Sequence, residues 1–191
     1  MSRKVIATIL IFLFVIILIL LYGYAVEPNM FITKEYTIKD PNLPDSFDGV
    51  KIVHFSDLHY GRNITLKSID RFVKEINFIK PDIVVFTGDL VETPNELNDN
   101  DFDILVEHLS KINARIGKYA ILGDHDYEEN VEILKSTLTD SGFDILLNES
   151  DAIYNNSMEK IMLYGVDDVL KDRANLDKTF EINNEDYKIV L

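Results

Sequence analysis

The sequence HFSDLHYG, residues 54–61, completes an apolar run that begins at Val50 and has the composition of a β-strand. Asp57 and His59 follow this run two positions apart, so both side chains can turn toward one point at the strand exit. A carboxylate and an imidazole together suit a divalent metal ion. A single Asp-x-His pair often arises by chance, but two later strands also lead into acidic residues, at Gly88-Asp89 and at Gly123-Asp124-His125-Asp126.

Apolar periodicity predicts that strands and helices alternate around these three points. The main strands are expected at 50–56, 82–87 and 118–122, with helices at 65–79, 102–112 and 130–138; shorter strands are expected at 143–147, 152–154, 160–164 and 187–191, and a helix at 172–180. This alternation predicts an α/β fold with a parallel sheet. Ligands of such sheets bind beyond the carboxyl ends of the strands, so the acidic residues are expected to meet there.

The N-terminus contains an uninterrupted apolar run, Val5 to Tyr22, whose only polar member is Thr8. No strand is this long, so the run predicts one transmembrane helix. The small residues Gly23 and Ala25 leave a cleaved signal peptide as an alternative, although the run exceeds the usual signal length and favours an uncleaved anchor. Arg3 and Lys4 place the N-terminus in the cytoplasm and the rest of the chain outside, at a cell membrane.

The remaining boundaries follow from composition. Residues 1–26 form the expected anchor, 27–47 a linker with an edge strand at 35–39, and 48–191 one globular domain. The 191 residues carry a net charge of −14, which disfavours extended binding to nucleic acid. Part of this excess fits carboxylates gathered around a cation. The chain has no cysteine, which excludes thiolate nucleophiles and cysteine-ligated zinc.

The ordered blocks Asp57-Leu58-His59, Gly88-Asp89-Leu90-Val91-Glu92 and Gly123-Asp124-His125-Asp126 resemble those of calcineurin-like metallophosphoesterases. Gly165-Val166-Asp167-Asp168 is similar to a block of their membrane-anchored bacterial branch. The resemblance covers residues 48–191 and implies a sandwich of layered β-sheets flanked by helices. It also implies hydrolysis of phosphomonoesters or phosphodiesters, with lipid-linked phosphorylated substrates as a further expectation.

The same resemblance implies roles for five residues. Asp57 and His59 would hold a first metal ion, Asp89 would bridge two ions, and Asp124 would bind the second. His125 would face the phosphate or the leaving group and is the expected catalytic residue. Two divalent ions, Mn, Fe or Zn, are therefore expected. The family usually has asparagine where this chain has Asp124, which adds a negative charge to the expected site.

The family pattern also includes further histidines, whereas this chain has no histidine after His125. The sequence therefore predicts a domain that is incomplete at its C-terminus, and an inactive remnant with weak metal binding is the alternative function. Other polar residues near the blocks are weaker candidates. Asp126 is expected either to orient His125 or to cap a helix, Glu92 and Asp168 are less expected in the site, and His54 and His108 are expected outside it.

Overall fold

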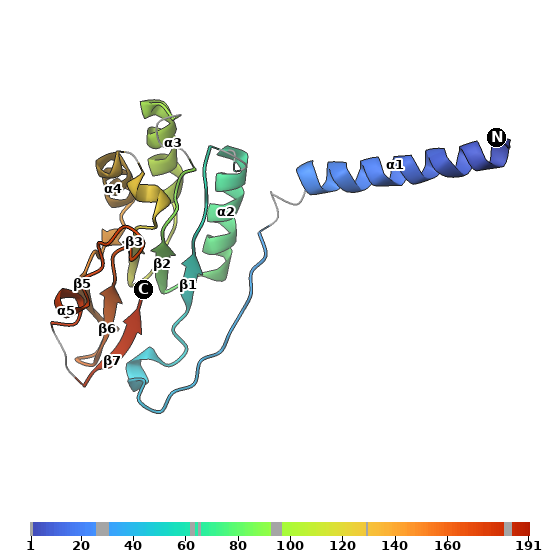
Figure 1. Ribbon diagram of the computed structural model, residues 1–191. Coiled ribbons are helices and arrows are strands. Elements are labelled where there is room, and N and C mark those ends of the chain that lie inside the picture. The colour runs from blue at the N-terminus through green and yellow to red at the C-terminus, as the bar shows by residue number, and fades with distance from the viewer. Residues whose placement is uncertain are drawn as a thin grey trace. The chain divides into compact units, whose positions relative to one another are not determined.

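The computed structural model describes residues 2–25, 31–61, 64, 66–92, 97–128, 130–181 and 185–191 (Figure 1). The chain divides into two compact units, Met1–Glu35 and Tyr36–Leu191.

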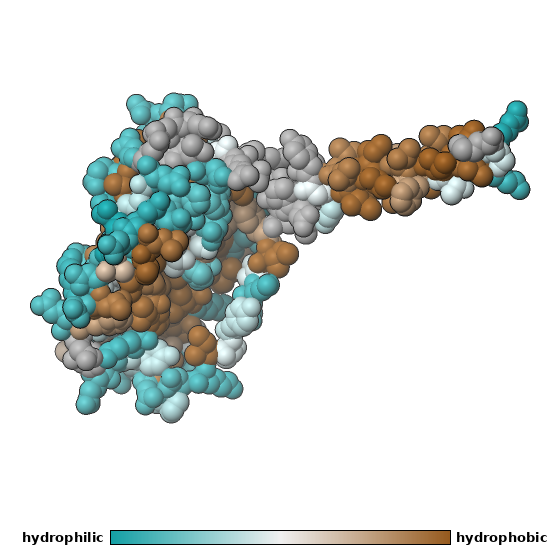
Figure 2. Space-filling view, viewed as in Figure 1, coloured by the Kyte–Doolittle hydropathy of each residue, from teal (hydrophilic) through white to brown (hydrophobic). Residues whose placement is uncertain are grey.

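The first unit consists mainly of helix α1, Arg3–Ala25, which confirms the helix expected at residues 5–22. Its segment Arg3–Gly23 is 21 residues long, predominantly apolar and exposed. At 1.5 Å per residue it measures about 30 Å, the thickness of a bilayer's hydrocarbon core. Hydrophobic residues cover most of its surface (Figure 2). By length and composition, α1 is therefore able to cross a membrane.

The second unit is built on a parallel sheet in the order β1-β2-β3-β4. Its strands are β1 (Ile52–Phe55), β2 (Ile83–Thr87), β3 (Gly117–Ile121) and β4 (Asp144–Ile145). β2 lies between two partners and is buried at four of its five residues, as its continuous apolar sequence predicts. Since the strands are parallel, their carboxyl ends all lie at one edge of the sheet.

A second sheet has the order β5-β6-β7, with β5 antiparallel and β7 parallel to the central β6. Its strands are β5 (Glu149–Tyr154), β6 (Lys160–Gly165) and β7 (Tyr187–Val190). Ile83 and Val85 of β2 share one hydrophobic cluster with Ile161 and Leu163 of β6. The two sheets therefore face each other across a common core.

Alternate residues of a strand point to opposite faces of the sheet, so each strand of the first sheet also presents side chains on the face away from this core. Helices cover that second face. Phe55 of β1 packs edge-on against Phe72 of α2 (Leu66–Ile79), with ring centroids 4.9 Å apart. Helices α3 (Asp99–Leu109) and α4 (Val131–Asp140) contact each other, and α3 also contacts α2. The result is the layered α/β sandwich expected from the sequence (Figure 1).

Several elements differ from the sequence-based expectation. Residues 35–39 form no strand and pair with none of the strands in the described part of the chain. Helix α3 begins at Asp99, earlier than expected, because Asn98 and Asp101 form a reciprocal capping box at its start. Only Leu176–Thr179 of the helix expected at 172–180 is helical, as α5. The Asn- and Asp-rich sequence at 95–101 predicts a loop, but its residues 99–101 belong to α3, and residues 95 and 96 lie outside the described residues.

Candidate metal centre

The chain segments that leave β1 and β2 run side by side beyond the strand ends. The backbone N–H of Asp57 donates to the carbonyl of Gly88 at 3.0 Å, and that of His59 donates to the carbonyl of Asp89 at 3.1 Å. Tyr60 continues the pattern with Leu90 at 3.0 Å. These bonds fix the first two acidic blocks of the sequence against each other.

Three residues of these segments have backbone conformations that are uncommon for residues other than glycine. The φ angles are 53° at Asp57, 42° at His59 and 62° at Asp89. Aspartate and histidine tolerate this left-handed region better than β-branched residues do. Such strain persists where surrounding bonds hold it in place, and it is concentrated at functional sites. Here it turns the side chains out of the strand pleat.

Close backbone approach brings the third block to the same place. A Cβ atom at Gly88 would lie 2.2 Å from the backbone nitrogen of Gly123, and one at Gly123 would lie 2.3 Å from Oδ1 of Asp89. Both positions therefore need glycine for the exits of β2 and β3 to touch. The single-turn helix η4, His125–Tyr127, follows directly.

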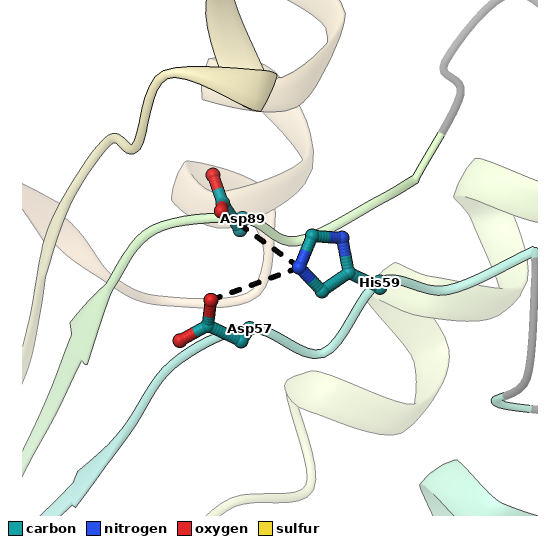
Figure 3. Close-up of side chains that lie close together, drawn as sticks. All are labelled: Asp57, His59 and Asp89. Atoms are coloured by element: carbon teal, nitrogen blue, oxygen red, sulfur yellow. Dashed lines mark ion pairs between the residues drawn. The ribbon is translucent and has the colours of Figure 1, made fainter. Parts of the chain in front are cut away.

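The first candidate ligand group consists of Asp57, His59 and Asp89, each of which offers one donor atom within 4.8 Å of the others. The Nε2 atom of His59 lies 3.7 Å from Oδ1 of Asp57 and 3.8 Å from Oδ2 of Asp89 (Figure 3). These distances are too long for direct hydrogen bonds. They leave space for a cation between the three donor atoms.

The second candidate ligand group consists of Asp89, Asp124 and His125, again with donor atoms within 4.8 Å of one another. Asp89 belongs to both groups. Its Oδ2 faces His59, whereas its Oδ1 accepts the backbone N–H of His125 at 3.3 Å. The rings of His59 and His125 lie edge to face, 5.3 Å apart between centroids. The five residues singled out in the sequence thus lie together, with Asp89 in the middle.

Asp126 has neither of the two roles expected for it, which were to orient His125 or to cap a helix. Its side chain is fully buried and accepts three backbone N–H groups, from Asp89 at 2.8 Å, Leu90 at 3.0 Å and Gly123 at 3.0 Å. It therefore neither orients the His125 ring nor caps a helix. It joins the exit of β2 to the exit of β3, a role that no local sequence pattern indicates.

Glu92 lies closer to the site than the sequence indicated. Its Oε2 atom lies 2.8 Å from Nδ1 of His59, on the side of the ring opposite the nitrogen that faces Asp57 and Asp89. A carboxylate on the far nitrogen of a metal-binding histidine fixes the ring orientation and raises the basicity of the ligand. Glu92 therefore fits a supporting role behind His59.

Electrostatics favour a cation at this position. Burial raises the pKa of Asp89, and the neighbouring charge of Asp124 raises it further, against a hydrogen bond from His125 that lowers it. Within the described parts of the chain, the ion pairs of Asp57 and Asp89 are with His59 and none is with lysine or arginine. Hard oxygen donors and imidazole nitrogens in this number fit a divalent ion such as Mn, Fe or Zn.

The remaining candidates lie elsewhere. The Nε2 atom of His54 is 2.7 Å from Oγ1 of Thr87, within the sheet, and His108 is on α3. Oδ1 of Asp168 accepts the backbone N–H of Lys171 at 2.5 Å, so its carboxylate stabilises a loop. None of these three is in a candidate ligand group of the described residues.

Fold and site together define an α/β sandwich with a candidate metal centre at the ends of parallel strands. Residues 50–190 match the model of the calcineurin-like phosphoesterase family. The chain belongs to this family, which confirms the resemblance seen in the sequence. Hydrolysis of phosphoric esters with divalent metal ions is the chemistry of the family.

Three relatives illustrate the family. An uncharacterized metallophosphoesterase, YkuE of Bacillus subtilis, is 37% identical over 152 residues, 78% of this chain and 52% of the relative. The UDP-2,3-diacylglucosamine pyrophosphatase LpxG of Chlamydia trachomatis is 35% identical over 109 residues, 53% of this chain and 30% of the relative. A transmembrane protein with metallophosphoesterase domain from Danio rerio is 28% identical over 148 residues, 76% of this chain and 32% of the relative. The chain thus spans about half or less of the length of these relatives.

Proposed function

We propose that this chain is a membrane-tethered phosphoesterase whose site holds two divalent metal ions. The observation that carries the proposal is the position of Asp89, which belongs to both candidate ligand groups, with Oδ2 facing His59 and Oδ1 accepting the backbone N–H of His125. A shared carboxylate is what two cations about 3.5–4 Å apart require. Asp57 and His59 complete the first ligand set, and Asp124 serves the second.

The residues around these ligands have distinct tasks. His125 contributes an imidazole that is exposed over about a third of its side chain and can reach a bound phosphate. In this proposal it protonates the leaving oxygen or holds a phosphate oxygen, as expected of the catalytic residue. His125 also belongs to the second ligand group, so metal ligation is the alternative use of the same ring. Glu92 holds His59 in orientation.

Bound divalent ions would polarise the phosphoryl oxygens and lower the pKa of a coordinated water near the reacting phosphorus. The protein's part is to fix the donors. Asp126 does this by joining the backbone of Asp89 to that of Gly123. Mn, Fe and Zn all accept mixed oxygen and nitrogen donors.

The proposed substrate is a phosphorylated small molecule or, preferably, a lipid-linked phosphoester or diphosphate. The name of the relative LpxG is that of an enzyme acting on a diacylated sugar nucleotide. Helix α1 supports the same class, since an anchor in the membrane would keep the site near such lipids. Arg3 and Lys4 favour a single-pass topology in the cell membrane, with the N-terminus in the cytoplasm and the catalytic domain outside.

Calorimetric titration of the full chain with Mn²⁺ in detergent micelles tests the shared carboxylate. Asp89→Asn should remove binding at both positions, whereas Asp57→Asn should weaken only one of them. His108→Ala, on α3, is the matched control and should bind as the wild type does. Unchanged Mn²⁺ binding in Asp89→Asn would sink the assignment.

Hydrolysis of bis-p-nitrophenyl phosphate and p-nitrophenyl phosphate tests the activity. The proposal expects Mn²⁺-dependent turnover that His125→Ala reduces by about 10²-fold or more, as for a lost general acid, while His108→Ala has no effect. Metal binding without turnover of either ester would favour the inactive remnant instead.

A further inference from the structure

The loop between β6 and α5, residues 166–175, presents large apolar side chains to solvent. Val169 and Leu170 are consecutive and are 72% and 81% exposed, and Leu176, the first residue of α5, is 58% exposed. Single exposed hydrophobic residues are ordinary on protein surfaces, whereas clustered ones mark interaction sites. Three within eight positions therefore require an explanation.

This β6–α5 loop is internally well bonded, so the exposure does not come from a lack of structure. The carbonyl of Asp168 accepts the N–H groups of Arg173 at 3.0 Å and Ala174 at 3.1 Å. Oδ1 of Asn148 accepts the N–H of Asn175 at 2.7 Å, and its Nδ2 donates to the carbonyl of Arg173 at 2.9 Å. These bonds form the loop while leaving Val169 and Leu170 outside.

The same loop is attached to the candidate metal centre. The hydroxyl of Tyr127 donates to Oδ1 of Asp167 at 2.5 Å, and the guanidinium of Arg173 lies 4.3 Å from the centre of the Tyr127 ring. Tyr127 ends the single-turn helix that begins at His125. The exposed apolar side chains are therefore on the rim of the end of the domain that carries the site.

A lipid surface is within reach of this rim. If α1 crosses a bilayer, residues 26–35 are the only link between its end and the domain that begins at Tyr36. Ten residues span at most about 35 Å, roughly the diameter of the domain, so the tether would keep the domain close enough for this rim to reach the membrane surface. Residues 169–181 contain three basic and three acidic residues in a chain of net charge −14, so anionic lipids repel this segment less than the chain as a whole.

We propose that Val169, Leu170 and Leu176 insert into the interfacial region of the bilayer that α1 crosses, and that this contact turns the metal centre toward lipid head groups. The inference rests on the proposed membrane tether. Shallow insertion of a few apolar side chains beside basic residues is how many peripheral proteins bind membranes. It would deliver a lipid-linked phosphate to the site from the membrane surface.

Site-directed fluorescence tests this directly, because the chain has no cysteine and a single introduced cysteine labels cleanly. The full chain with Leu170→Cys carries an environment-sensitive fluorophore and is reconstituted into vesicles of phosphatidylcholine and phosphatidylglycerol. We expect a blue shift of its emission and strong quenching by lipids spin-labelled near the head group. Met158→Cys is the matched control, because Met158 is 93% exposed and precedes β6 at the end of the strand opposite the loop. It should show neither effect.

A third label at Leu13→Cys, in the middle of α1, separates the inference from the tether on which it rests. Lipids spin-labelled deep in the acyl chains should quench the label at position 13. If they do so while the label at position 170 is not quenched, the membrane tether is supported and the inference is overturned. Quenching at neither position overturns both. Shielding of the label at 170 from aqueous iodide without lipid quenching also overturns the inference, because a protein surface then covers the loop.

A charge substitution completes the test with a reporter at Leu176→Cys. Adding Val169→Asp should abolish the lipid quenching at 176, because a carboxylate resists transfer out of water. Adding Met158→Asp in the same background should leave that quenching unchanged. Equal quenching in both variants would contradict the proposed contact.

Discussion

The carboxylate of Asp126 accepts the backbone N–H of Asp89 at 2.8 Å, although 37 positions separate the two residues. The same carboxylate also accepts the N–H groups of Leu90 and Gly123. Burial raises the pKa of Asp126 above its usual value, although the three hydrogen bonds to its carboxylate partly offset this effect. One buried side chain thus determines the distance between the strand exits that carry Asp89 and Asp124.

We predict that Asp126→Ala costs at least about 3 kcal/mol of the free energy of unfolding, because three buried N–H groups lose their acceptor. We also expect Mn²⁺ affinity to fall about 10–100-fold, as for other losses behind a metal ligand. Urea unfolding followed by circular dichroism and calorimetry of the full chain in micelles measure both quantities. Asp140→Ala, exposed at the end of α4, is the control. Loss of stability with wild-type Mn²⁺ affinity would separate Asp126 from the site.

The contact between Gly88 and Gly123 leads to a second prediction. Gly88 and Gly49 both have positive φ, 98° and 74°, but only at Gly88 would an added Cβ meet backbone, whereas nothing lies within 4 Å at Gly49. Gly49→Ala should cost about 1–2 kcal/mol from backbone strain alone. Gly88→Ala should cost about 3 kcal/mol or more, because steric overlap adds to the strain. Equal urea midpoints for the two variants would refute the close approach.

A third prediction concerns pH. Burial raises the pKa of Asp82, but hydrogen bonds from the Lys51 backbone at 2.8 Å and the Arg115 side chain at 2.5 Å lower it more in sum, so the pKa is below 3.8. A lowered pKa in the folded state stabilises the fold above the unfolded value, and this contribution disappears as pH falls through the folded pKa. Asp82→Asn should therefore cost about 1–2 kcal/mol at pH 7.

The difference in the free energy of unfolding between the wild type and Asp82→Asn should become smaller as the pH falls below 3.8. Urea unfolding at several pH values measures this difference. Asp70 is the control, because its pKa is also lowered by Lys74 but the pair is exposed on α2. Asp70→Asn should not change stability measurably. A pH-independent effect of Asp82→Asn would mean that shape, and not charge, determines its contribution.

The order of strands and helices could be predicted from the sequence because each main element follows its own apolar period. The continuous apolar run of β2 and the helical spacing of Ile69, Phe72, Val73 and Ile76 in α2 are examples, and all four helix residues are buried. The prediction of a strand at 35–39 was wrong. Alternating polar and apolar residues form a strand only where a partner strand is present. Local patterns thus predict elements better than they predict pairing.

The ligand residues of the candidate site could also be predicted, because the three blocks follow parallel strands whose ends must meet. The supporting residues could not. Asp126 bonds to backbone groups that any sequence would provide, and the contact of Glu92 with His59 depends on the path of the chain after β2. Such contacts form only when distant segments meet in the folded chain, and no local pattern in a single sequence indicates them.

A fourth prediction tests the anchor. Because α1 is long and apolar enough to cross a bilayer, the full chain should remain in the membrane fraction after alkaline carbonate washing. Substituting Leu13 and Ile17, near the middle of the helix, by lysine should release it, since each central charge costs about 2.5–3.5 kcal/mol on insertion. Recovery of the unmodified chain in the soluble fraction would contradict the anchor, and a shortened soluble product would indicate cleavage of a signal peptide.

The last prediction concerns Glu92, whose Oε2 lies 2.8 Å from Nδ1 of His59. Glu92→Gln keeps the size of the side chain but removes the negative charge behind the ring, so the His59 nitrogen that faces Asp57 and Asp89 becomes a weaker metal ligand. We expect Mn²⁺ affinity to fall about 10-fold or more, with stability nearly unchanged. Glu128→Gln is the matched control, because Glu128 lies 3.6 Å from Nδ1 of His125, beyond hydrogen-bonding distance. Equal losses of affinity in the two variants would point to general electrostatic attraction of the cation, whereas a loss confined to Glu92→Gln would show that the carboxylate behind His59 strengthens this metal ligand.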